Sequence, residues 1–439
     1  MLSIKRPARR PRKLDWYPEK MYLHFDLPLG RAKATALVTD PEAVVKHSFL
    51  PLIAFDKRER RYRRQKDGPP IVKTKIRKLA YCSNRDACIF GYYAHILNEP
   101  YERLIEQLGL DDVVIGYRRL GSNIDLALAA FRDIRTRGSC VAFAYDISGF
   151  FDNIDHGALK RNWARVLGKA RLPDDHYKVF MRLSKFSTVN RQACLRRLGE
   201  RPNAKDRDIK RRQLCDIDRY RKLIRGDDGV STNLVETWKR DYRIPQGTPL
   251  SALAANIAMI DFDVKMLDAV TRLGGSYRRY SDDILIVIPP MHRKAVPVVL
   301  NDTLKLTTRR LRVNKDKVEI VEFVPGGLSK GPGSKALQYL GFIFDGRQHL
   351  LRSSTLAKYY RRLHRAVGSV RQSVKKVKVG DLPGRPTCYK RKLLANMTHL
   401  GSGNFIRTYV ANAQWKMGVD PIGRQTAHHQ RKLERALER

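Results

Sequence analysis

The sequence predicts an α+β fold followed by a helical region. From residue 71 to residue 345, short apolar segments with the length of strands alternate with longer amphipathic segments. After residue 346 the pattern becomes helical and strongly basic, with 21 Lys and Arg against 4 Asp and Glu. We therefore expect a basic N-terminal extension over 1–70, a mixed domain over 71–345 and a basic α-helical region over 346–439.

The net charge of the chain indicates a polyanionic partner. Its 439 residues are 42% hydrophobic and 9% aromatic, a composition typical of folded proteins. The 87 Lys and Arg exceed the 44 Asp and Glu and give a formal charge of +43. Such a surface repels itself unless an anionic partner neutralises it, and nucleic acid is the polyanion that we expect.

The cysteines and the apolar segments predict a cytoplasmic protein without a membrane span. None of the six cysteines belongs to a CxxC pair, so neither a zinc module nor a disulfide framework is indicated. No apolar segment approaches the roughly 18 residues that a membrane helix needs. The basic arm from Lys5 to Lys13 is not followed by the apolar part of a signal peptide, so we expect it to contact phosphates.

Two acidic sites lie at the ends of predicted strands. The strongest strand patterns cover 141–144, 284–288 and 318–323. Asp146 follows the first of them, and Asp282 with Asp283 lies at a tight turn before the second. An Asp-Asp pair alone is more typical of a solvated hairpin corner, but together with Asp146 it favours a site for two divalent cations. We expect three catalytic residues, Asp146, Asp282 and Asp283, and two Mg²⁺ ions, with Mn²⁺ as an alternative, held by these residues and by Ile147.

Basic residues are concentrated in two further segments. Between the acidic sites, residues 157–240 are mostly polar, and we expect helices there with one basic face. The run from Lys57 to Lys66 is interpreted either as a solvated helix face or as a contact with nucleic acid.

Six segments resemble the ordered motifs of reverse transcriptases. Tyr280–Asp283 is similar to the two-aspartate motif of that family, and Tyr145–His156 resembles its first catalytic motif. Pro245–Ser251, followed by Asn256, resembles the motif that supports the incoming nucleotide and the template. The other three are the fingers segment Lys75–Leu79, the lysine loop Asn314–Lys317 and the primer-grip hairpin Gln338–Phe342. The resemblance covers about 71–345 and implies a right-hand polymerase fold, with fingers and palm in that domain and a helical thumb over 346–439.

The resemblance also implies roles for individual residues. The implied nucleotide-binding residues are Lys75, Arg77, Phe151, Gln246, Gly247 and Lys317, and the implied primer-grip residues are Tyr339, Leu340 and Gly341. Arg77 would contact phosphate with two parallel hydrogen bonds, and Lys317 would neutralise or protonate the departing pyrophosphate. Gly247 would let the backbone approach the substrate. Lys73 and Lys315 are the alternatives at the two lysine positions.

Phe151 lies where the family places the bulky residue that packs under the sugar. An aromatic ring there leaves no room for a 2′-hydroxyl, so the resemblance implies synthesis of DNA rather than RNA. The alternative is that Phe150 enters the core and Phe151 only packs beside it. We expect Asp152, Asp155 and His156 to serve the start of a helix rather than the site.

Looser motifs resemble the defence-associated reverse transcriptases of bacteria, in the abortive-infection and unknown groups. They are Asn84–Ala94 with Pro100–Glu102, and Gly116–Arg119. This resemblance implies antiphage activity, a structured non-coding RNA as the template, dNTPs as substrates and cDNA as the product. The residues expected to bind the RNA are Arg196, Arg197, Arg211, Arg212, Arg361, Arg362, Lys375, Lys376 and Arg391.

Three functions remain open from the sequence. The first is RNA-templated synthesis of DNA in phage defence, and the second is retron-like, protein-primed or template-independent synthesis by the same fold. The third is an RNA-binding scaffold whose polymerase site is idle. The intact set Asp146, Asp282, Asp283, Gln246 and Phe151 argues against the third. A second copy of the chain or an accessory defence protein would be a further partner.

Overall fold

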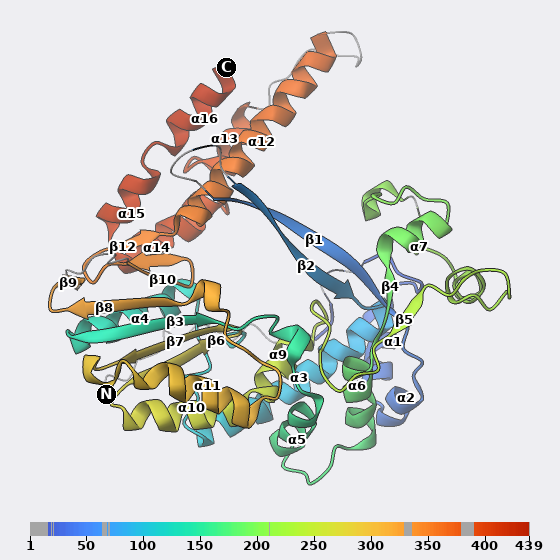
Figure 1. Cartoon of the computed structure of the whole chain (residues 1–439). Helices are drawn as coiled ribbons and strands as arrows, with labels where there is room; N and C mark the ends of the chain where they lie inside the picture. The colour runs from blue at the N-terminus through green and yellow to red at the C-terminus, as the bar shows by residue number, and fades with distance from the viewer. Residues whose placement is uncertain are drawn as a thin grey trace. The chain divides into compact units, whose positions relative to one another are not determined.

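The computed structural model describes residues 16–18, 20, 22–63, 68, 71–209, 211–328, 336–378 and 390–438 (Figure 1). Side chains are not described for 61–63, 73, 373–378, 390 and 438. Contacts divide the chain into two compact units, each made of three separate stretches. The first unit comprises Met1–Val113, Ser148–Met266 and Asn301–Arg312, and the second comprises Val114–Ile147, Leu267–Leu300 and Val313–Arg439.

The second unit contains a five-stranded antiparallel sheet in the order β6-β7-β3-β8-β9. Its strands are β3 (Cys140–Asp146), β6 (Ser276–Tyr280), β7 (Asp283–Ile288), β8 (Glu319–Val324) and β9 (Gly327–Leu328). The three strands expected most strongly from the sequence are therefore found as neighbours in one sheet. Every residue of β7 after Asp283 is buried, as the continuous apolar run 284–288 predicts.

Helix α4 (Asn123–Arg137) supplies part of the core of the second unit. Its buried residues Ile124, Ala127, Phe131 and Ile134 follow the spacing of one helix face. They form one cluster with Leu285 and other buried residues of the sheet. The helix begins with a capping box in which Ser122 and Asp125 satisfy backbone donors, and this fixes where the chain enters the helix.

A small sheet and the C-terminal helices complete the second unit. The sheet has the order β10-β11-β12, with β10 (Leu337–Tyr339), β11 (Phe342–Phe344) and β12 (His349–Leu351). The helices that follow are α12 (Ser353–Lys378), α13 (Lys390–Met397), a π-helix (Ile406–Val410), α14 (Ala411–Met417), α15 (Val419–Thr426) and α16 (His429–Glu438). The expected boundary at 345/346 falls between β11 and β12, so the helical region shares its core with strands on both sides of that boundary.

The first unit contains a four-stranded sheet in the order β2-β1-β4-β5. Its strands are β1 (Leu52–Arg63), β2 (Ile71–Tyr81), β4 (Ser187–Asn190) and β5 (Val235–Thr237). Strands β1 and β2 form a long antiparallel hairpin from Ile53↔Tyr81 to Arg63↔Ile71, and β4 lies parallel to β1. The expected boundary at 70 therefore separates the two strands of one hairpin.

The basic run that starts at Lys57 lies in β1, so the interpretation as a helix face is wrong for its described part. The spacing of charges along the run did not decide between helix and strand. Strand β2, which is distant in sequence from the start of the run, supplies backbone hydrogen-bond partners along β1 and so determines that the run is a strand. The rest of the run, residues 64–66, lies outside the described residues, as does the basic arm Lys5–Lys13.

Helices form most of the remaining first unit. They are α1 (Arg31–Val38), α2 (Pro41–Lys46), α3 (Asn84–Gln107), α5 (His156–Val166), α6 (Asp174–Ser184), α7 (Arg191–Arg197), α8 (Ile217–Arg219), a π-helix (Tyr220–Arg225) and α9 (Ser251–Ala258). Helices α10 (Ile260–Arg272) and α11 (Ala295–Thr307) contribute residues to both units. Segment 157–240 contains helices, as expected, but they cover about half of it, and the segment also contains β4 and β5. No helix among the described ranges is long and apolar enough to cross a membrane.

The described cysteines, Cys82, Cys88, Cys140, Cys194 and Cys215, are all free and buried. Burial raises the pKa of each of these thiols, because the thiolate loses hydration. They therefore contribute to packing as neutral thiols.

Candidate active site

The second unit places the three aspartates at one end of its five-stranded sheet. Tyr280 pairs with Asp283 across the β6–β7 hairpin, so Ser281 and Asp282 form a two-residue turn. Asp283 is in turn the register partner of Asp146 at the end of β3. Because paired residues of neighbouring strands lie side by side, the two acidic sites of the sequence meet here.

Backbone hydrogen bonds fix the turn to the end of β3. The N–H of Ile147 donates to the carbonyl oxygen of Asp282 at 2.9 Å. Ser281 adopts a left-handed φ of +59° and is 2% exposed, so the turn is conformationally demanding and closely packed. On the other side, the N–H of Asn314 donates to the carbonyl oxygen of Asp146 at 2.8 Å. The position of the carboxylates therefore depends on three distant chain segments.

Both carboxylate oxygens of Asp146 have a partner from the lysine loop. Lys317 Nζ lies 2.5 Å from Asp146 Oδ1, and Asn314 Nδ2 donates to Asp146 Oδ2 at 3.2 Å. The side chain of Asn314 also caps the short 3₁₀ helix Lys315–Lys317 by accepting from the N–H of Asp316. Between the two lysines considered from the sequence, Lys317 is the one that reaches Asp146.

The pKa of Asp283 is shifted by lost hydration and by the other charges of the cluster. Its pKa is raised to about 7, because the surrounding protein displaces part of its hydration and because Asp282 and Asp146 add like charge. The positive charges of Lys317 and Arg352 oppose this rise of the pKa only in part. A cation bound among the three aspartates would relieve their repulsion.

The chemistry of the donors fits a hard divalent cation. The carbonyl oxygen of Ile147 accepts no backbone hydrogen bond from a residue that the structure describes, so it is available beside Asp146 as a ligand. Oxygen donors of this kind suit Mg²⁺ or Mn²⁺. The described His, Cys, Asp and Glu side chains form no ready group of three for a metal. At Asp146 the ammonium of Lys317 supplies the positive charge that the carboxylate faces in this structure.

The primer-grip residues form a tight turn in the same unit. Strands β10 and β11 are joined by Leu340 at φ +45° and Gly341 at φ +95°, the left-handed pair of a two-residue hairpin. The side chain of Asn123 donates to the carbonyl oxygen of Leu340 at 3.0 Å, and the N–H of Arg352 donates to that of Gly341 at 3.0 Å. Tyr339 is buried, so the turn rather than the tyrosine ring presents the surface here.

The loop with Gln246 and Gly247 belongs to the first unit and packs against the end of β2. The N–H of Ala80 donates to the carbonyl oxygen of Gln246 at 2.9 Å. Gly247 has φ +125°, and a Cβ atom at this position would lie 2.5 Å from the carbonyl oxygen of Ala80. Glycine is therefore required here by the backbone contact itself, which is a structural reason separate from access for a substrate.

The other expected nucleotide-binding residues also lie in the first unit. Phe150 is 4% exposed and enters the core, whereas Phe151 is half-buried at the start of a 3₁₀ helix. Arg77 forms an ion pair with Glu59 across the β1–β2 hairpin, with 2.6 Å between Nη1 and Oε2. Lys75 is the register partner of Glu59. Arg77 therefore has an intramolecular partner that a phosphate would have to replace.

Three residues excluded from the site have the structural roles expected of them. Asp155 caps α5 by accepting from the N–H of Ala158 at 2.7 Å. Asp152 pairs with Arg243 at 3.0 Å, and the ring of His156 contacts the carbonyl oxygen of Arg243. These interactions position the start of α5 after the first catalytic motif.

The residues expected to bind RNA fall into two groups. Arg196 and Arg212 are exposed in the first unit, and Arg361, Arg362 and Arg391 are exposed on the C-terminal helices. Arg197 instead donates to the carbonyl oxygens of Leu223 and Thr232, and Arg211 pairs with Glu200. The side chains of Lys375 and Lys376 lie outside the described residues.

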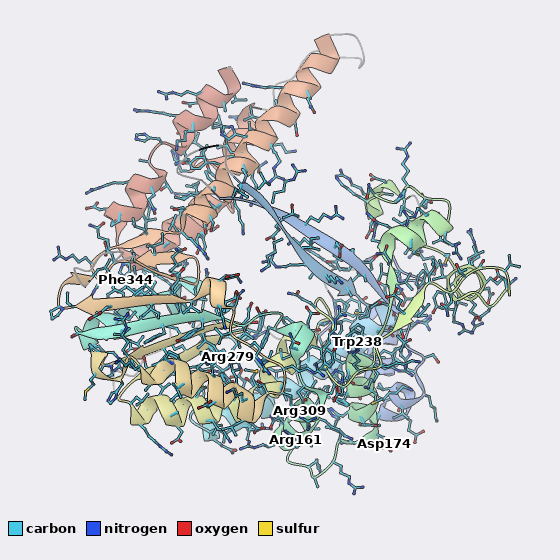
Figure 2. All side chains as sticks on the ribbon, in the orientation of Figure 1. Arg161, Asp174, Trp238, Arg279, Arg309 and Phe344 are labelled. Carbon is cyan, nitrogen blue, oxygen red and sulfur yellow. The ribbon has the colours of Figure 1, made fainter. Side chains whose placement is uncertain are left out.

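Two residues beside this turn were not proposed as site residues from the sequence, although Tyr117 belongs to the motif Gly116–Arg119. Arg352 acts on the pKa of Asp283 from the segment after β12, and no local pattern marks it. Tyr117 lies in a loop that is distant in sequence from the turn, and only the fold brings its ring near that of Tyr280. The side chain of Arg279, labelled in Figure 2, is fully buried on β6 next to the same turn.

One protein-family model matches a segment that contains several residues of the candidate site. Residues 203–344 match the family model described as reverse transcriptase (RNA-dependent DNA polymerase). The match includes Gln246, Asp282, Asp283, Lys317 and Tyr339, whereas Asp146 precedes it. This segment is therefore similar to a reverse transcriptase domain. No curated protein matches the chain.

Solved structures similar to the chain include yeast telomerases. Telomerase from Candida albicans, in complex with a TWJ fragment of telomeric RNA, matches with a TM-score of 0.44 and 13% identity over 93% of this chain and 65% of that one. Apo telomerase from Candida tropicalis matches with 0.42 and 11% over 94% and 66%. Its form truncated from the C-terminal domain gives 0.39 and 11% over 72% and 58%. The chain thus spans roughly 58% to 66% of the length of these telomerase chains.

Proposed function

We propose that the chain is an RNA-directed DNA polymerase that joins deoxynucleotides by metal-assisted phosphoryl transfer. The observation that carries this proposal is the pairing of Asp146 with Asp283 at the end of the sheet, with Asp282 in the adjoining turn. Rigid strand ends hold these carboxylates in place, which is what positioning of two divalent cations requires. The reverse transcriptase match over 203–344 supports RNA as the template.

In this proposal the acidic and the basic residues of the chain have different roles. Asp146, Asp282, Asp283 and the carbonyl of Ile147 would hold Mg²⁺, which would supply activation of the attacking 3′-hydroxyl and neutralisation of the triphosphate. Lys317, whose ammonium pairs with Asp146, would neutralise or protonate the departing pyrophosphate. Lys75, Arg77, Gln246 and Gly247 are the proposed nucleotide-binding residues, and Phe151 is proposed to exclude the 2′-hydroxyl. Tyr339, Leu340 and Gly341 hold the primer strand.

The proposed template is a structured non-coding RNA, and the proposed role is antiphage defence in a bacterial cytoplasm. The formal charge of +43 and the exposed Arg196, Arg212, Arg361, Arg362 and Arg391 support binding to RNA through phosphates and shape. The resemblance of Asn84–Ala94 and Gly116–Arg119 to defence-associated reverse transcriptases supports the biological role.

Sequencing of the RNA and DNA that copurify with the protein tests this function. One abundant RNA with complementary DNA is expected from the wild type, and only the RNA is expected from the Asp282→Ala/Asp283→Ala variant. DNA of random sequence or DNA linked to protein would point to untemplated or protein-primed synthesis. RNA without DNA from the wild type would contradict polymerase activity.

A further inference from the structure

The segment 114–119, here called the 114–119 loop, is attached to the strand that leads into the catalytic turn. Val114 forms a parallel bridge with Arg279 of β6. The N–H groups of Ile115 and Gly116 both donate to the carbonyl oxygen of Arg279, at 2.9 and 3.3 Å. Figure 2 labels Arg279 at this position. The loop is therefore attached to β6 at a position two residues before Ser281. The attachment consists of backbone hydrogen bonds, which do not depend on the side chains of the loop.

The backbone of the loop is in direct contact with the turn. A Cβ atom on Gly116 would lie 2.6 Å from the backbone nitrogen of Ser281 and 3.0 Å from Cα of Tyr280. Real Cβ atoms do not approach backbone so closely, so only glycine fits here. This close approach places the next residue, Tyr117, at the surface beside the catalytic turn.

Tyr117 combines a strained backbone with an exposed ring. Its φ is +61°, in the left-handed region that is costly for a bulky side chain. Tyr117 is 49% exposed, so burial of its ring does not explain why this position has a tyrosine, although a glycine would adopt the same φ without strain. The ring centroid lies 6.1 Å from that of Tyr280, at an angle of 41°. Tyr117 and Tyr280 thus form a pair of rings, and Tyr280 is the cross-strand register partner of Asp283.

We infer that Tyr117 is a positioning residue whose exposed ring stacks on a nucleobase at the growing end of the bound primer–template. The inference rests on the proposed function, because polymerisation requires the primer terminus and the templating base to lie beside the aspartates. Every base offers a π-face, so one aromatic ring can serve a template of any sequence. A rigid loop that holds this ring at the turn orients the terminus before reaction.

The first experiment measures stacking directly. The full chain is mixed with Mg²⁺ and a primer–template carrying 2-aminopurine either at the primer terminus or at the templating position. Stacking on Tyr117 is expected to quench the fluorescence at one of these positions, which identifies the base. Tyr117→Gly, which also removes the φ strain, is expected to abolish that quenching without lowering the melting temperature, and Tyr117→Phe is expected to preserve it.

The second experiment separates positioning from chemistry. Tyr117→Gly is expected to raise KM for the primer–template about ten-fold, as loss of one base–aromatic stack does, with kcat nearly unchanged. An abasic nucleotide at the stacked position should raise KM to the same extent in the wild type and have no further effect in Tyr117→Gly. The control is Tyr177→Ala on α6, which removes a tyrosine of comparable exposure, 41%, and should leave KM unchanged.

Either of two results would overturn the inference. One is equal quenching and equal KM in the wild type and Tyr117→Gly, and the other is additive effects of Tyr117→Gly and an abasic nucleotide at both positions. Failure of the proposed function looks different, because the wild type would then bind the primer–template without extending it. The fluorescence experiment still decides the role of Tyr117 in that case.

Discussion

Lys317 Nζ lies 2.5 Å from Asp146 Oδ1, beside the aspartates of the candidate site. The side chain of Asp146 is 17% exposed and that of Lys317 is 38% exposed, so the pair is partly shielded from water. The lysine balances an acidic cluster in which the pKa of Asp283 is already raised to about 7 by lost hydration and by Asp282 and Asp146. This pairing suggests that one ammonium group serves the metal-free and the reacting states in turn.

Replacement of Lys317 should separate these two roles. Lys317→Met is expected to lower kcat by roughly 10²-fold, the lower limit for loss of a general acid. It should also increase the rise in melting temperature on adding Mg²⁺, because the cations would no longer compete with an ammonium. Single-turnover primer extension and thermal unfolding with and without Mg²⁺ measure both effects. Lys315→Met is the matched control, and an equal effect of the two variants would contradict the assignment.

Loss of charge in the catalytic turn should abolish synthesis without unfolding the protein. Asp282→Asn with Asp283→Asn keeps the side-chain shape but removes two negative charges, so primer extension is expected to fall by more than about 10³-fold. Affinity for RNA should remain, because the basic residues are intact. Asp316→Asn in the exposed lysine loop is the control. Residual synthesis at the wild-type rate would place the catalytic site elsewhere.

Phe151 should determine the choice of sugar. Phe151→Ala is expected to raise ribonucleotide incorporation relative to deoxynucleotide incorporation by roughly ten-fold or more, because a smaller side chain admits the 2′-hydroxyl. The ratio of kcat/KM for a matched rNTP and dNTP measures this selectivity. Phe55→Ala removes another partly exposed phenylalanine of the first unit and should leave the ratio unchanged. An unchanged ratio in Phe151→Ala would leave Phe151 as a packing residue beside Phe150.

The exposed and the engaged arginines of the first unit should behave differently. Arg196→Glu with Arg212→Glu is expected to weaken RNA binding and reduce the slope of log K against log salt by roughly 1.4 to 1.8, the value for two lost phosphate contacts. Arg197→Ala with Arg211→Ala should mainly lower the melting temperature, since these side chains hold Leu223, Thr232 and Glu200. The reverse result would assign RNA binding to the engaged pair. Filter binding across a salt series distinguishes the two outcomes.

Buried His24 should make the first unit sensitive to acid. Its pKa is lowered from 6.5 to about 4, mainly because burial removes hydration from the charged ring. Above pH 6.5 the ring is neutral in both states, and as pH falls from 6.5 to 4 only the unfolded chain gains a proton. The free energy of unfolding should therefore fall over this window by up to about 3 kcal/mol from His24.

The difference between the wild type and His24→Asn isolates this effect. The raised pKa of Asp283 acts in the opposite sense, since the folded protein gains a proton there as pH falls from 7 toward 3.8. That contribution cancels when the two proteins are compared at each pH. Denaturant unfolding followed by tryptophan fluorescence, to which Trp163 and Trp238 of the first unit contribute, measures the difference. A difference that stays constant from pH 7 to pH 5 would contradict the assignment.

Local patterns predicted the catalytic strands well. The apolar runs at 141–144, 284–288 and 318–323 correspond to β3, β7 and β8. Strands β3 and β7 are buried over most of their length, and β8 buries Val321 and Phe323. The helical C-terminal region was also predicted from its spacing. The spacing of charges did not predict the conformation of the run that starts at Lys57, because pairing with β2 determines that this run is a strand rather than a helix. The predicted boundary at 70 falls within the β1–β2 hairpin, and the one at 345 falls between β11 and β12.

The sequence by itself determined where the aspartates of the candidate site lie relative to the strands, because strand, turn and carboxylate follow one another within a few positions of the chain. Only the tertiary structure decided that Asp283 is the partner of Asp146, that Lys317 rather than Lys315 reaches it, and that Tyr117 lies beside Tyr280. These relationships join segments that are more than a hundred residues apart. Their geometry is set by strand register and backbone contacts, which composition and spacing along one segment do not encode.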